Sequence, residues 1–223
     1  MRGVLTYSRK LDSPEQVEIA CDEGRINSDG SLERWRAIRD TFTPNPVPVW
    51  HDEGALRVAA EWMSKPGIVW TEHVAFAERL SELTGVPYFG AKGFSKAGQY
   101  IEDADGNAPI IVSIDANKEG KNLQFKWSRN LYTSMPENAI ELQQSLARTH
   151  RTGQPKDVVE ADIMLGCIEH MRAFEKAIEG SKVIRDTVGD DAKILRATII
   201  DWPSELDVEA WPGALWGKID PDK

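Results

Sequence analysis

The chain has 223 residues, of which 41% are hydrophobic and 28% are charged, and its formal net charge is −9. This composition is that of a globular protein with one sizeable core, and no apolar run reaches the roughly 18 residues that a membrane-spanning helix needs. An acidic surface repels phosphate groups, so the composition excludes nucleic-acid binding by the whole surface and leaves only a local groove for it.

The ends of the chain and the cysteines narrow the class further. Residues 1–10 lack the apolar core of a signal peptide, so we expect a cytoplasmic protein with no membrane partner. Cys21 and Cys167 stand far apart and form no metal-like cluster with the histidines, which argues against a structural zinc site. From Asp201 onward acidic residues are interleaved with tryptophans, a pattern typical of a packed extension or a docking segment.

The elements follow one another in two different patterns. Residues 1–46 are polar and rich in turns, with one helix expected over 32–39. Beyond Pro48 the hydrophobic spacing alternates regularly between the helical and the strand period. We expect helices over 56–63, 74–84, 95–104, 136–149 and 166–178, and strands over 67–71, 86–89, 108–114, 126–132 and 158–165.

This alternation predicts the fold class and the organisation of the chain. Strands that alternate with helices at such spacing form βαβ units, and so predict an α/β fold with a mainly parallel sheet covered on both faces. In such folds ligands collect at the carboxyl ends of the strands. The predicted parts are a polar leading segment (1–46), an α/β lobe (47–166), and a helical extension with the acidic tail (167–223).

One constellation within the predicted helix 136–149 carries chemistry. Gln144 and Arg148 are four residues apart and share a helix face, and Arg151 follows at or just past the helix end. Two guanidinium groups on one face suit the spread negative charge of a transferring γ-phosphoryl group, since each planar guanidinium group can form bidentate hydrogen bonds with phosphate oxygens. Two arginines alone would favour the simpler interpretation of a solvated, charged helix end.

The flanking residues favour the phosphate-binding interpretation. The stretch from Gln144 to Gln154, Gln-x-x-x-Arg-x-His-Arg-x-Gly-Gln, strongly resembles motif VI of superfamily-two helicases, specifically of the Swi/Snf-type ATPases. Thr152 replaces the isoleucine of that pattern. The residues from Ser113 to Gln124 resemble motif V, with Gly120, Asn122 and Leu123 in its Gly-x-Asn-Leu positions, although one earlier glycine is absent.

A third match precedes these two. Residues 67–73 are similar to motif IV, which opens the second lobe of such enzymes, and the order and spacing agree across residues 67–159. The resemblance therefore implies a RecA-like three-layer sandwich with a helical C-terminal extension. The particular residues of motifs V and VI look like those of phage-encoded members, which would act in the cytoplasm of the host cell.

The resemblance implies a function that this sequence contains only in part. It makes Arg148 and Arg151 catalytic arginine fingers and places Gln144 and Gly120 with them at a bound ATP. A complete enzyme also needs a first lobe with a phosphate-binding Gly-x-x-x-x-Gly-Lys-Ser/Thr loop and an acidic metal motif. The stretch from Asp115 to Asn122 only imitates that loop, and Asp52 before Glu53 is more simply a helix N-cap. We therefore expect ATP and Mg²⁺ to be held mainly by a first RecA-like lobe, supplied in cis or in trans.

Nucleic acid, with duplex DNA favoured by the Swi/Snf resemblance, is the expected second partner. The candidate contacts are cationic and amide side chains on predicted loops near strand ends: Lys92, Asn117, Lys118, Lys121 and Asn122. Solvated loop lysines explain these positions equally well, because acidic residues are interspersed among them. A different class of function also stays open, namely a catalytically silent RecA-like adaptor that binds DNA or a protein partner.

Overall fold

The computed structural model describes residues 14–28, 30–43, 47–118, 120–136, 138–189 and 191–198, so the acidic tail from residue 201 lies outside the described residues. The chain divides into two compact units, Met1–Val49 and Trp50–Lys223. The structure thus divides the chain after Val49. The predicted boundaries at residues 46 and 166 stay predictions.

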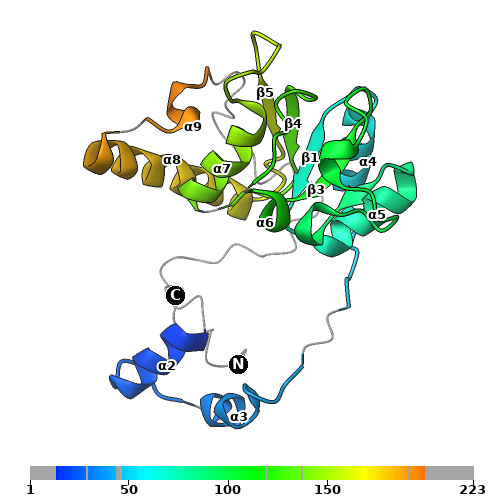
Figure 1. The fold of residues 1–223 in the computed structure, drawn as a ribbon. Helices are drawn as coiled ribbons and strands as arrows, with labels where there is room; N and C mark the ends of the chain where they lie inside the picture. Colours follow the sequence, from blue (N-terminus) through cyan, green and yellow to red (C-terminus); the bar gives the residue numbers. More distant parts are fainter. Residues whose placement is uncertain are drawn as a thin grey trace. The chain divides into compact units, whose positions relative to one another are not determined.

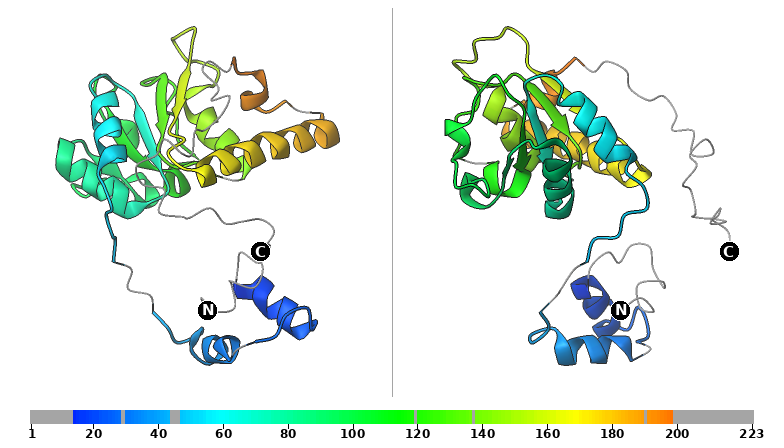
Figure 2. Two further views of the ribbon diagram at one scale, coloured as in Figure 1. Left: turned by 180° about the vertical axis from the view of Figure 1, so that it is seen from behind. Right: turned by 90° about the vertical axis from the view of Figure 1, so that its right-hand side faces the viewer.

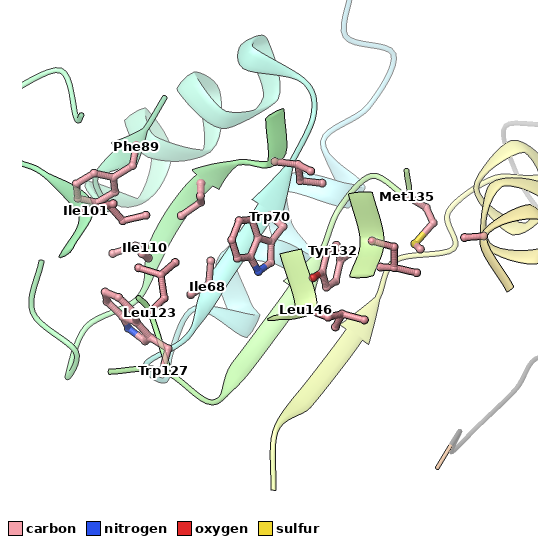
Figure 3. Close-up of a cluster of buried hydrophobic side chains, with 14 of the residues drawn as sticks. Ile68, Trp70, Phe89, Ile101, Ile110, Leu123, Trp127, Tyr132, Met135 and Leu146 are labelled. Carbon is pink, nitrogen blue, oxygen red and sulfur yellow. The ribbon is translucent and has the colours of Figure 1, made fainter. Parts of the chain in front are cut away.

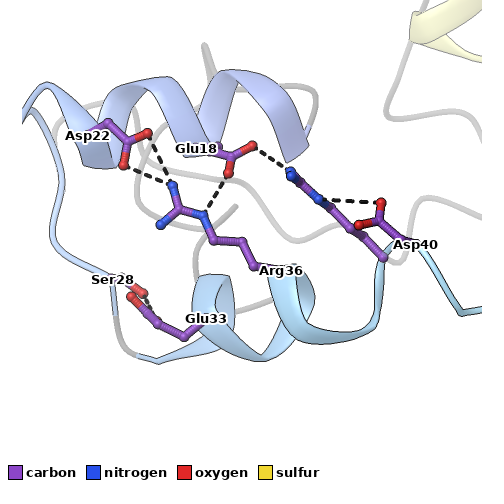
Figure 4. Close-up of polar contacts among 7 residues, drawn as sticks. Glu18, Asp22, Ser28, Glu33, Arg36 and Asp40 are labelled. Carbon is purple, nitrogen blue, oxygen red and sulfur yellow. Dashed lines mark hydrogen bonds and ion pairs between the residues drawn. The ribbon is translucent and has the colours of Figure 1, made fainter.

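The first unit contains two short helices, α2 (Pro14–Asp22) and α3 (Ser31–Ile38). Val17, Ala20 and Leu32 are buried between them. Figure 4 shows the polar contacts that join the helices, in which the Arg36 guanidinium donates to Glu18 at 2.6 Å and to Asp22 at 2.9 Å. The hydrogen bonds with Asp22 and Glu18 raise the pKa of Arg36 above its ordinary value. The expected helix over 32–39 is confirmed, whereas α2 had no predicted counterpart.

The second unit is a five-stranded sheet with the order β2-β3-β1-β4-β5, in which every described pairing is parallel. Helices cover both of its faces, as Figures 1 and 2 show. Its elements in chain order are α4 (Gly54–Trp62), β1 (Ile68–Thr71), α5 (Val74–Thr84), β2 (Tyr88–Phe89), β3 (Ile110–Ser113), α6 (Ile114–Asn117), β4 (Arg129–Tyr132), α7 (Ala139–Thr149), β5 (Glu160–Ile163), α8 (Ile168–Val188) and α9 (Lys193–Arg196). The predicted α/β fold with a RecA-like layered arrangement and a C-terminal helix is confirmed.

The strand sequences determine which face packs against which helices. In β1, Ile68 and Trp70 point to one face and Val69 to the other, because successive side chains of a strand alternate. Val69 belongs to the core beneath α4 and α5, with Leu56 and Leu80. Ile68 and Trp70 belong to the core beneath α7 and α8, part of which is drawn in Figure 3.

Local signals determine where several helices begin and end. Helix α5 has the bounds predicted from its apolar spacing, and Gly85 ends it in the left-handed conformation, with φ of 72°. The side chain of Asn138 accepts a hydrogen bond from the backbone N–H of Ile140 and so caps the beginning of α7. Asp52 does accept from the Gly54 N–H at 2.7 Å, but the residue at the N-cap position of α4 is Glu53.

One predicted helix is wrong. The segment that includes residues 95–104 is instead irregular. Isolated antiparallel bridges join Phe89 to Ser95 and Phe94 to Tyr100, and short 3₁₀ turns span Ala91–Gly93 and Ile101–Asp103. Gly98 has a φ of 82°, a left-handed conformation that breaks a right-handed helix. Ile101 is nevertheless fully buried, so its apolar character reflects core packing and not a helical stripe.

Candidate functional site

The two arginines lie in and just after the last turn of α7. This end of α7 lies beside the amino end of β4, because the Thr149 hydroxyl donates to Asn130, the second residue of that strand, at 3.2 Å. A helix that follows a parallel strand runs back along the sheet. The arginines therefore do not lie at the carboxyl ends of the strands, where ligands of such folds usually collect.

Arg148 contacts the predicted motif V turn directly. Its Nη1 donates to the backbone carbonyl of Lys121 at 3.1 Å, and its Nε donates to the carbonyl of Gln144 at 3.0 Å. Arg151 donates through Nη1 to the Oδ1 of Asn122 at 3.3 Å. Motifs V and VI thus meet through these two side chains, whose contacts join residues 27 and 29 positions apart in the sequence.

The remaining motif VI residues shape the end of the helix. Gly153 has a φ of 93°, and a Cβ there would lie 2.9 Å from the ring of Phe125, so both conformation and space favour glycine. The Gln154 amide donates to the carbonyls of Thr149 and Trp127, each at 2.9 Å. These bonds satisfy a carbonyl at the end of α7 and tie the turn to the chain that enters β4.

Buried polar contacts fix α7 on the sheet. The Oδ1 of Asn130, a fully buried side chain, accepts from Trp70 Nε1 at 3.1 Å as well as from Thr149, and its amide donates to the carbonyl of Glu160. The Tyr132 hydroxyl donates to the Ser145 hydroxyl of α7 at 2.9 Å. Burial raises the pKa of Tyr132 well above its ordinary value, since the phenolate would lose its solvation.

The motif V turn occupies the chain between α6 and β4. Gly120 adopts a φ of 71°, and no atom lies within 4 Å of the position that its Cβ would take. Glycine is therefore favoured here by the left-handed backbone conformation and not by a lack of space. The backbone N–H of Asn122 donates to the carboxylate of Glu102 at 2.6 Å. Lys121 Nζ donates to the Tyr100 hydroxyl at 2.8 Å and lies 4.7 Å from the centre of that ring. Tyr100 and Glu102 had no predicted role, because nothing in their spacing marks them.

The predicted nucleic-acid contacts lie in different environments. Lys92 is exposed and has a left-handed φ of 57°, and Lys121 lies close by, since its Nζ is 3.5 Å from the Lys92 carbonyl. The Lys118 ammonium group pairs with Glu141 at 2.6 Å and with Asp115 at 3.3 Å, and the hydrogen bond with Glu141 raises the pKa of Lys118.

Asn117 differs from these residues because its side chain is fully buried. Its amide donates to the carbonyls of Phe89 at 3.0 Å and Ser113 at 3.2 Å. In this arrangement the side chain links the ends of β2 and β3 and has no open path to a nucleic acid.

The described residues offer cationic groups for a phosphate but no metal site. Among the residues searched, no group of three or more histidine, cysteine, aspartate or glutamate side chains could hold a metal ion. The described part of the chain also has no helix long and apolar enough to cross a membrane. A hollow of about 950 Å³ beside β5 is lined by Leu146 of α7 and by His150 just after that helix, but neither Arg148 nor Arg151 lines it.

Comparison with known proteins extends the resemblance beyond the motifs. No protein-family model matches the chain. It is 30% identical, over 192 residues and 78% of its length, to the uncharacterized ATP-dependent helicase YqhH of Bacillus subtilis. It is 25% identical, over 122 residues and 50% of its length, to the RNA polymerase-associated protein RapA of Photobacterium profundum.

The chain is shorter than both relatives, spanning 32% of the length of YqhH and 12% of that of RapA. Among solved structures, the C-terminal part of the Fun30 ATPase domain matches with a TM-score of 0.45 and 15% identity, over 75% of this chain and 61% of that one. The similarity to YqhH supports the resemblance to ATP-dependent helicases. Both relatives in sequence are bacterial, so the phage-like character of the motifs stays a prediction.

Proposed function

We propose that this chain provides the second lobe of a DNA-dependent, helicase-type ATPase, in which Arg148 and Arg151 act on an ATP held by a first lobe. The observation that carries the proposal is the convergence of both guanidinium groups on the turn at Gly120–Asn122. Such groups stabilise the charge that spreads over the γ-phosphoryl oxygens during transfer, and an arginine finger accelerates phosphoryl transfer by roughly 10³ to 10⁵.

The side chains available in this chain suggest which groups each of the two lobes would supply. Arg148, Arg151 and the neighbouring Gln144 and Gly120 offer donors and an open turn to phosphate oxygens, whereas the described residues offer no acidic cluster for Mg²⁺. ATP and Mg²⁺ would therefore be held by the first lobe, in cis or in trans, and Mg²⁺ would supply charge neutralisation between the phosphates. Closure of the lobes would bring the two arginines to the nucleotide.

In the same proposal, Lys92, Lys118, Lys121 and Asn122 face the phosphate backbone of the nucleic acid. Such contacts carry no sequence information and weaken with salt. Replacing exposed Lys92 with alanine should weaken DNA binding equally for unrelated sequences. It should also reduce the slope of log K against log[salt] by about 1, as fluorescence anisotropy at several salt concentrations would measure.

The decisive experiment is reconstitution of the ATPase. The chain is combined with a first lobe from the upstream or neighbouring coding sequence, and ATP hydrolysis is measured with and without duplex DNA. We expect DNA-stimulated hydrolysis by the pair, negligible hydrolysis by the chain alone, and a loss of roughly 10³ or more in kcat for Arg148→Ala or Arg151→Ala. Arg57→Ala, on the exposed surface of α4, is the matched control.

Two results would contradict the proposal. Robust ATP hydrolysis by the isolated chain that disappears in Arg148→Ala would show that no separate first lobe is needed. DNA binding without ATPase activity in every combination of lobes would instead favour the adaptor function.

A further inference from the structure

Two separate segments of the chain hold the turn at Gly120–Asn122. Arg148 and Arg151 of the α7 end contact it through the Lys121 carbonyl and the Asn122 side chain. In the segment that precedes β3, Glu102 accepts from the Asn122 backbone N–H at 2.6 Å, and Tyr100 accepts from Lys121 Nζ at 2.8 Å. Lys121 and Asn122, the two turn residues that the arginines contact, are thus also held by the segment that precedes β3.

That segment is anchored in the core and can serve as a rigid support. Ile101 and Ala104, on either side of Glu102, are buried with relative exposures of 0% and 2%. The ring of Tyr100 packs against Phe94 at 5.2 Å between centroids. Lys126 Nζ donates to the backbone carbonyls of Glu102 and Ala104, at 2.5 and 2.7 Å. The Glu102 carboxylate therefore extends from a backbone that is fixed on both sides.

The hydrogen bond between the Asn122 backbone N–H and the Glu102 carboxylate belongs to a strong class. A backbone N–H that donates to a carboxylate forms a charge-assisted hydrogen bond, which is shorter and about twice as strong as a neutral one. Gly120 leaves the turn otherwise adaptable, since glycine populates many conformations. A fixed acceptor for the Asn122 N–H selects one of them and so fixes the Lys121 carbonyl and the Asn122 side chain together.

We propose that Glu102, assisted by Tyr100, is a positioning residue for the arginine fingers. Glu102 holds the Gly120–Asn122 turn in place, and this turn orients Arg148 and Arg151. The inference rests on the proposed function. Because a misplacement of about 1 Å can cost on the order of a hundredfold in rate, loosening this turn should slow hydrolysis while leaving ATP binding nearly intact.

The test has one measurement on the chain alone and one with a first lobe. NMR of the ¹⁵N-labelled chain follows the Asn122 backbone amide and the side-chain resonances of Arg148 and Arg151. Glu102→Ala should shift all three, Glu102→Gln should shift them less because it retains an oxygen acceptor, and Asp103→Asn should leave them in place. Asp103 is the matched control, since it is an exposed acid on the same short turn.

In the reconstituted ATPase, Glu102→Ala should lower kcat by about ten- to a hundredfold, with the KM for ATP changed less than about threefold. Glu102→Gln should recover part of the rate. Tyr100→Phe, which keeps the ring and removes the hydroxyl, should give a smaller loss in kcat.

The outcomes separate this inference from the proposed function. Unmoved arginine resonances in Glu102→Ala, or an unchanged kcat, would overturn the positioning role. If wild-type lobes together show no ATPase activity, the proposed function fails, and the NMR measurement alone decides whether Glu102 orients the two arginines.

Discussion

The two faces of the parallel sheet are packed in different ways. The face beneath α4 and α5 is filled with aliphatic side chains such as Val69, Leu80 and Ile111, all fully buried. The face beneath α7 also contains large apolar side chains, but buried hydrogen bonds run through it from Asn130 and Tyr132 to that helix. Only the second face supports α7, which carries Arg148 and is followed two residues beyond its end by Arg151.

The difference separates stability from positional precision. Burial of apolar surface stabilises a fold without prescribing direction, so apolar packing alone specifies the position of a helix less strictly than directional bonds do. A satisfied network of buried hydrogen bonds admits one arrangement, because displaced partners would be left unpaired at low dielectric. We therefore infer that the α4 and α5 face contributes mainly stability and that the α7 face fixes the arginines.

The largest effect on stability should come from the aliphatic face. Leu80→Ala removes a side chain with 0% exposure and should lower the free energy of unfolding by about 2–5 kcal/mol, through lost burial and a residual cavity. Urea unfolding followed by tryptophan fluorescence measures this change. Leu83→Ala, on the same helix but 53% exposed, should change it by less than about 0.5 kcal/mol. The NMR resonances of Arg148 should stay in place, and a shift in them would contradict the division between the faces.

Asn130→Ala should have a smaller effect on stability and a larger one on the site. It leaves the buried Trp70 N–H without its acceptor, which should cost about 1–3 kcal/mol in the free energy of unfolding. Thr149 loses its bond to β4, so the end of α7 should shift and the Arg148 and Arg151 resonances should move with it.

A double-mutant cycle with Thr149→Val tests this contact, and we expect a coupling of roughly 0.5–3 kcal/mol in urea unfolding. Additive effects of the two substitutions would mean that Asn130 does not hold the helix end.

The sequence predicts much of this sheet because local and tertiary preferences agree there. The run of residues 108–114 is apolar and β-branched, and β3 occupies its centre with all four residues buried. Helix α5 has its predicted bounds, since its apolar spacing and Gly85 specify the same element. Helix α8 instead continues ten residues beyond the predicted end at Ile178, to Val188, and most of this added part is exposed, so no apolar stripe marked it.

The site could be predicted only in part. Motif spacing placed Gln144, Arg148 and Arg151 together, and α7 does carry the first two. The partners of the arginines include a backbone carbonyl at Lys121, which every residue type offers and which therefore leaves no trace in a sequence. The role of Asn130 could not be predicted either, because in the sequence a polar residue only interrupts the apolar pattern of a strand. Its three hydrogen-bond partners become visible only in the structure.

The smallest effect at neutral pH should come from Tyr132→Phe, which removes one buried hydroxyl and its bond to Ser145. We expect a loss of about 0.5–1.5 kcal/mol in the free energy of unfolding, because the Ser145 hydroxyl retains its bond to the Leu142 carbonyl. The same variant should behave differently at alkaline pH, since burial raises the pKa of Tyr132 in the folded state.

The sign of that difference follows from proton linkage. Above pH of about 10 the tyrosine of the unfolded chain loses its proton while the folded chain retains it. The contribution of Tyr132 to stability is therefore fully present below that pH and declines as the pH rises, by at most about 1.4 kcal/mol per pH unit. Urea unfolding at several pH values above about 10 should show a shallower decline for Tyr132→Phe than for the wild type, whereas Leu80→Ala should keep the wild-type slope. Equal slopes for Tyr132→Phe and the wild type would mean that the hydroxyl reaches solvent, and the α7 face would then lack one of the two contacts that distinguish it from the face beneath α4 and α5.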